Sequence, residues 1–231
     1  ILNLPAPSNY IGAARIFGIE EDVESGLASV RALPVTRIIN DHAASLEPNE
    51  TDGWMPPRLE QKTGHVPTVD GVRKIPDSLR RAVMCFILSS AIRGLREQGP
   101  IINSMLVHVI RYTKVQEIVR EEIEEALQEI VNRLELGDGD RKPSIIDEFC
   151  SLWKDDYIPT SDASGPDYGL PAMEDVLAKL PRIGASVVVK SINGSALDSL
   201  DYEQYRGTGL NVIAVGGDKL SRGLTLDGLT V

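Results

Sequence analysis

The chain has 231 residues, of which 42% are hydrophobic, enough for one large globular domain or a domain with a small satellite. Its formal net charge of −10 argues against a nucleic-acid-binding surface over the whole protein, but leaves room for a local basic groove. No apolar run approaches roughly eighteen residues, so no membrane-spanning helix is predicted.

The two ends of the chain and its cysteines indicate how it is processed and in which cellular compartment it is expected. It starts at Ile1 without a charged, cleavable leader and stops in the apolar, strand-like run Leu224–Val231, so we expect a piece of a longer protein without a signal peptide. Cys85 and Cys150 lie far apart on apolar faces of expected helices. This favours reduced thiols in the cytoplasm over a disulfide framework.

Residues 1–75 are expected to be largely irregular. Prolines hold the backbone open near the start, and a short helix can follow within Ile1–Gly18. Leu33–Asn40 has the composition of a short strand. His42–Lys74 is rich in proline, glycine and charge, which is typical of a long irregular insertion.

From residue 76 onward, helical spacing of apolar residues alternates with β-prone runs. The predicted helices are Pro76–Arg96, Thr113–Leu134, Ser144–Asp156 and Met173–Leu180. Thr113 with Gln116 has the spacing of a capping box, and Ser161–Tyr168 is expected to be a loop.

The β-prone runs predict the fold class. They are Met105–Ile110, Ser186–Ile192, Asn211–Val215 and the start of a further strand in Leu226–Val231. Strands that alternate with helices predict a three-layer α/β core with a parallel sheet flanked by helices. Ligands in such folds bind at the carboxyl edge of the sheet.

Several motifs are weak. Asp147-Glu148 resembles an acidic Mg²⁺ motif, but the apolar spacing around it is helical. Glu60-Gln61-Lys62 has a nuclease-like spacing without an acid on an upstream strand. The sequence has no Gly-x-x-x-x-Gly-Lys-Ser/Thr loop for nucleotide phosphates. No metal site is predicted.

The informative stretch is 211–231. A buried strand ends at Gly216-Gly217, where two glycines permit close approach of the backbone, and Asp218 can cap a short helix. Arg222 would then stand at the carboxyl edge of the sheet. The alternative is a surface loop with incidental glycines.

A resemblance sharpens this pattern. Asp218, Arg222 and Gly223 match motif V of superfamily-two helicases, usually Asp-x-x-x-Arg-Gly-Ile/Leu-Asp, whereas Thr225 departs from its final aspartate. The longer run Gly-Gly-Asp-Lys-Leu-Ser-Arg-Gly-Leu-Thr-Leu-Asp-Gly-Leu resembles the Z-one (Z1) domain family, whose bacterial members carry the label endonuclease. Segments at 4–18, 103–116 and 189–202 resemble that family in the same order.

The resemblance implies a RecA-like second helicase lobe at residues 76–231, truncated after motif V. Residues 1–75 would lead out of a first motor lobe that carries the phosphate loop, and the arginine-finger motif would follow Val231. The longer protein would use ATP and Mg²⁺ and act on DNA in restriction, repair or phage defence, with partner proteins of such systems, in the cytoplasm and without a membrane. This chain alone is expected to bind no cofactor and to be inactive.

The expected site follows from strand ends and motif V. Arg222, with Asp218, would couple ATP turnover to DNA, and Thr225 stands at the implied nucleotide-contacting position. The expected nucleic-acid contacts are His108, Arg111, Tyr112, Thr113, Ser191, Asn193, Ser195, Gly216, Gly217, Lys219, Ser221 and Gly223.

For some of these residues a purely structural role remains an alternative. His108 could be a satisfied core histidine, and Tyr112 and Thr113 could simply start a helix. A protein-interaction module and a metal-dependent nuclease remain alternative functions.

Overall fold

The computed structural model describes residues 12–20, 29–60, 62–97, 100–165, 169–192, 201–217 and 226–231. The chain divides into two compact units. One comprises Ile1–Ile38 and Cys150–Leu170, and the larger one comprises Ile39–Phe149 and Pro171–Val231.

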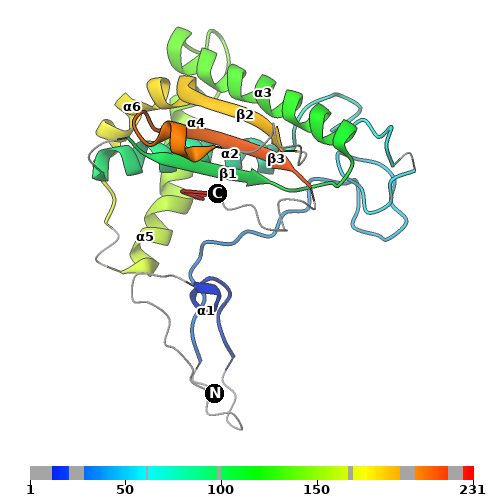
Figure 1. Ribbon diagram of the computed structural model, residues 1–231, viewed down its shortest axis with the longest axis horizontal. Helices are drawn as coiled ribbons and strands as arrows, with labels where there is room; N and C mark the ends of the chain where they lie inside the picture. Colours follow the sequence, from blue (N-terminus) through cyan, green and yellow to red (C-terminus); the bar gives the residue numbers. More distant parts are fainter. Residues whose placement is uncertain are drawn as a thin grey trace. The chain divides into compact units, whose positions relative to one another are not determined.

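The larger unit is built on a parallel sheet in the order β1-β3-β2 (Figure 1). The strands are β1 (Ile102–Val107), β2 (Val187–Ile192) and β3 (Leu210–Gly216). Every pairing is parallel, which confirms the predicted direction of the strands. Their apolar, β-branched residues suit a sheet buried on both faces.

The expected strand near the end of the chain pairs with the other side of β1. Leu229 forms a parallel bridge with Ser104, and the Thr230 amide donates to the Ser104 carbonyl at 3.0 Å or less. Gly228 lies so close to β1 that a Cβ there would stand 1.9 Å from the Ile102 carbonyl oxygen. Only glycine therefore allows this approach.

Three helices pack together in the larger unit: α2 (Asp77–Arg96), α3 (Thr113–Leu136) and α6 (Met173–Ser186). The first two match the predicted helices closely. The third continues past its expected end at Leu180 and through Pro181. Gly184 lies against side chains of α2 and α3, with a would-be Cβ 3.2 Å from Val131, so burial continues beyond the proline.

The connections place different elements on the two faces of the sheet. The β1-to-β2 connection runs through α3 and α6, whose contacts reach β2 and β3. The return from β2 to β3 includes the 3-10 helix η4 (Tyr202–Tyr205), and this face of β3 packs against Tyr202, Tyr205 and Leu226. Connections between parallel strands are right-handed, and these two connections cross the sheet in opposite directions, so they lie on opposite faces. In the described ranges, the η4 face thus carries a 3-10 helix where the three-layer prediction expected an α-helix.

The 144–168 region differs from the prediction. The expected helix is α4 (Ile145–Leu152), followed by a π-helical turn η1 (Trp153–Tyr157) and then α5 (Ile158–Ser164), which replaces the first part of the expected loop. Proline within the first two residues of α5 lacks the N–H that a continuous α-helix would need. The π turn absorbs this break, and the rings of Trp153 and Tyr157 stack 5.8 Å apart across it.

The smaller unit also lacks the strand expected at Leu33–Asn40. It contains α1 (Gly12–Phe17) and an isolated antiparallel bridge between Ile19 and Val30. Arg37 instead turns back to the Pro34 carbonyl, 2.6 Å away, and forms an ion pair with Asp156. These side-chain contacts take the place of a strand ladder.

The expected insertion at His42–Lys74 is confirmed as irregular, with turns and an isolated bridge in its described residues. Trp54 anchors it: the indole is 3% exposed and donates to Glu122 of α3 at 2.7 Å. Asp41 accepts hydrogen bonds from the Ser78 amide at 2.8 Å and hydroxyl at 2.6 Å, at the start of α2. The segment is therefore fastened to two helices.

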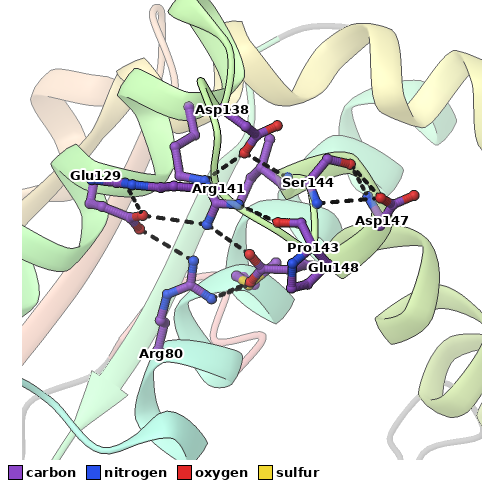
Figure 2. Close-up of polar contacts among 11 residues, drawn as sticks. Arg80, Glu129, Asp138, Arg141, Pro143, Ser144, Asp147 and Glu148 are labelled. Atoms are coloured by element: carbon purple, nitrogen blue, oxygen red, sulfur yellow. Dashed lines mark hydrogen bonds and ion pairs between the residues drawn. The ribbon is translucent and has the colours of Figure 1, made fainter.

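An ionic network ties α2, α3 and α4 together (Figure 2). Arg133, 8% exposed, binds Asp138 at 2.6 Å, Glu148 at 2.7 Å and the Pro143 carbonyl at 2.8 Å. Arg80 of α2 adds ion pairs to Glu148 and Glu129. Because its polar groups are paired on three sides, the buried guanidinium is a structural cross-link.

Among the helices of the described ranges, none combines the length and apolar character needed to cross a membrane.

Candidate functional site

The carboxyl ends of the three strands form one edge of the sheet. Val107 and Ser191 both pair with Val215, and Ile192 pairs with Gly216, so the strands end at the same level. His108 follows directly after β1 and is exposed. β1 therefore ends earlier than expected, and the core-histidine interpretation is wrong. Ser191 is half-buried at the end of β2.

Gly217, the residue directly after β3, lies against the loop after β1. A Cβ on Gly217 would stand 2.4 Å from the Gln116 Nε2, and 3.0 Å from both the Arg111 Cα and the Ile110 carbonyl oxygen. Two of these three neighbours are backbone atoms. A side chain therefore cannot be accommodated without moving the loop, as the prediction of a close glycine approach requires.

The N-terminus of α3 opens at the same edge. The helix follows Tyr112, which makes no side-chain capping bond, and Thr113 and Lys114 are exposed. The first amides of a helix have no acceptor within it, and they carry its positive end. The capping-box prediction is wrong, because the Gln116 amide group donates to the Ile110 carbonyl at 2.7 Å instead.

Basic side chains gather at this helix start. Arg111 is exposed, its guanidinium carbon lies 5.1 Å above the Tyr112 ring, and it donates to the Tyr112 hydroxyl at 3.0 Å. Lys114 adds a second exposed cation. From Glu117 on, α3 becomes acidic, and Arg120 is bound by Glu117 and Glu124, each at 2.6 Å. The basic patch is thus local, within an acidic chain.

The opposite edge of the sheet has a different character. Asn103 donates to Asn211 at 2.7 Å, and Asn211 donates to Ser186 at 2.7 Å. Arg93 covers the chain by donating to Asn103 at 2.7 Å. These side chains satisfy one another, so this edge is a closed structural network.

The structure brings together part of the predicted site. His108, Arg111, Tyr112, Thr113, Gly216 and Gly217 meet at the carboxyl edge, and Ser191 ends the neighbouring strand. The remaining predicted residues lie outside the described ranges: Asn193, Ser195, Asp218, Lys219, Ser221, Arg222, Gly223 and Thr225. Lys114 and Gln116 are additions, and placing the helix start at Thr113 is the signal that points to Lys114.

Histidine, cysteine and acidic side chains are the other groups of the described ranges that could supply metal or thiol chemistry. Within those ranges, no group of three or more histidine, cysteine, aspartate or glutamate side chains is arranged to hold a metal ion. Cys85 and Cys150 are both half-buried, and no disulfide joins them.

Comparison with known proteins identifies a family for the chain. The model of the family described as Z1 domain matches residues 78–231, two thirds of the chain, including the whole sheet and the site at its carboxyl edge. None of the curated proteins and none of the solved structures compared with the chain matches it.

Proposed function

Because the chain belongs to the Z1 domain family, we propose that the carboxyl edge of its sheet binds the phosphate backbone of DNA within a helicase-like motor. The parallel sheet, with its strands ending at one level, is the arrangement in which α/β proteins place ligands. In this proposal the described edge is one half of a DNA-binding site of the second motor lobe.

The observation that carries the proposal is the close approach at Gly217. It sets Gly217, the residue directly after β3, against the backbone of Ile110 and Arg111, next to the helix start at Thr113 and the exposed Lys114. Backbone N–H groups at a helix start, together with arginine and lysine, are the usual partners of phosphate oxygens. Sequence is not read by such contacts, so binding should tolerate any base sequence.

The residues of this chain do not fit a complete ATP site. The sequence contains no Gly-x-x-x-x-Gly-Lys-Ser/Thr loop, so nothing in it cradles the nucleotide phosphates in the usual way. We propose that ATP and Mg²⁺ bind where a second lobe of a longer protein meets this one. The chain's own part would be to hold DNA, and Arg222 would report that contact to the cleft.

Binding of mixed-sequence single-stranded and duplex DNA, measured by fluorescence anisotropy at low salt, tests the proposal. Arg111→Ala and Lys114→Ala should each weaken binding, because each removes a cation from the α3 start. Arg182→Ala is the matched control: Arg182 is exposed on α6, close to the segment that leads into the amino end of β2. Equal losses in all three variants would mean nonspecific charge attraction and would overturn the proposed site.

A further inference from the structure

Gln116 is a buried polar side chain at the joint between the two loops of the site. It is 2% exposed, on the second turn of a 24-residue helix whose other buried residues are mostly apolar. Its Nε2 donates to the Ile110 carbonyl at 2.7 Å, which fixes the orientation of the amide. Its Oε1 is buried and has no hydrogen-bond partner in the described part of the chain. Such an arrangement is unusual, because buried polar atoms are almost always paired.

The same amide contacts Gly217, the residue directly after β3. Its Nε2 stands 2.4 Å from where a Cβ of Gly217 would lie. Gln116 therefore touches Gly217 on one side and holds the Ile110 carbonyl on the other, one residue before Arg111. Because protein interiors are closely packed, a displacement of Gly217 or of the Ile110 carbonyl should move the Gln116 amide between them.

We infer that Gln116 is a positioning residue that couples Gly217, directly after β3, to the loop after β1 that is proposed to bind phosphate. It acts through the Ile110 carbonyl and Gly217, and it need not touch DNA itself. The inference rests on the proposed function for its consequence, since the coupled loops are those proposed to hold the DNA backbone. The coupling itself is a property of the fold and can be measured without any ligand.

A double-mutant cycle on unfolding tests the coupling. The variants are Gln116→Ala, Gly217→Ala and the double variant, each unfolded by urea. The alanine at 217 should be costly beside the intact amide and cheaper once the amide is gone, because truncation removes the atom at 2.4 Å. Residues in direct contact couple by about threefold to a hundredfold in the unfolding constant. Additive effects within about twofold would overturn the inference.

Local hydrogen exchange separates positioning from general stability. Gln116→Met keeps an unbranched side chain of similar length but cannot donate to the Ile110 carbonyl. It should speed amide exchange at residues 111–114 while leaving α6 unchanged. Gln128→Leu is the control on the same helix, since Gln128 is exposed and donates to the neighbouring Asn132 at 2.9 Å. Exchange that rises equally in both variants, or throughout the domain, would contradict a positioning role.

DNA affinity then tests whether the contact between Gln116 and Gly217 affects the proposed DNA-binding site. Gly217→Ala should weaken binding about tenfold or more, and adding Gln116→Ala should restore part of that loss. Failure of the wild-type protein to bind DNA would overturn the proposed function, while the unfolding cycle and the exchange data would still decide the coupling. DNA binding by the wild type with no coupling in the cycle would overturn this inference alone.

Discussion

The contact between Trp54 and Glu122 offers a prediction about how the irregular segment is held. The Glu122 side chain is fully buried; it accepts the indole N–H at 2.7 Å, and Arg73 stands 3.6 Å from its second oxygen. Trp54→Phe keeps an aromatic ring but removes the indole N–H that donates to this carboxylate. A lost hydrogen bond to a buried charge costs roughly 1.5–3 kcal/mol. In Glu122→Gln the acceptor is neutral, so the same change should cost only about 0.5–1.5 kcal/mol.

The pH dependence of the stability is an independent test of the burial of Glu122. Burial raises the pKa of Glu122 above its ordinary value of 4.5, although Trp54 and Arg73 oppose the shift. The unfolded chain therefore releases this proton at lower pH than the native chain. Between the two pKa values the native state binds more protons, so stability falls as pH rises. Wild type should lose stability relative to Glu122→Gln from about pH 4.5 up through the raised pKa of Glu122.

Urea unfolding followed by circular dichroism measures both effects, with Glu121→Gln as the control because Glu121 is half exposed on the same helix. Equal costs of Trp54→Phe in both backgrounds would refute the buried hydrogen bond. A wild type that gains stability relative to Glu122→Gln with rising pH would refute the role of burial.

Three further outcomes are expected. Arg133→Met should lower the free energy of unfolding by about 2–4 kcal/mol in urea titration, because the carboxylates of Asp138 and Glu148 lose their ion pairs with the guanidinium (Figure 2). An unchanged free energy of unfolding would show that water solvates these carboxylates equally well. Asp41→Ala should lower the free energy of unfolding by about 1 kcal/mol, measured the same way, because the Ser78 amide and hydroxyl at the start of α2 lose their acceptor. If the loss is the same in a Ser78→Ala background, the hydrogen bond from the Ser78 hydroxyl contributes nothing to stability. In the two-lobed motor that we propose, Arg222→Ala should leave the melting temperature nearly unchanged but reduce DNA-stimulated ATPase activity about ten- to a hundredfold, and wild-type stimulation would refute its coupling role.

Local patterns predicted most of the larger unit, and the reasons are physical. Apolar spacing of 3.6 residues located α2 and α3, and β-branched runs located the three strands, because burial imposes these periods. The errors occur where burial and secondary structure diverge. Ile110 is only 9% exposed yet lies beyond β1, so its apolar character extended the predicted strand across His108.

Other features depend on contacts that no local pattern carries. Thr113 and Gln116 have capping-box spacing, but the glutamine instead donates back to the Ile110 carbonyl, beside Gly217, which lies about a hundred residues further along the chain. Trp54 and Glu122 are 68 residues apart. The glycines at the end of β3, in contrast, were predictable, because a pair of glycines after a buried strand indicates a close approach.

The salt dependence of DNA binding tests the central claim most directly. Each phosphate neutralised by a cation contributes about −0.9 to the slope of log K against log salt for duplex DNA. If Arg111 contacts a phosphate at the carboxyl edge of the sheet, Arg111→Ala should make the slope less steep by about 1, while Arg182→Ala leaves it unchanged. An identical slope for wild type and Arg111→Ala, at any affinity, would contradict the proposed site.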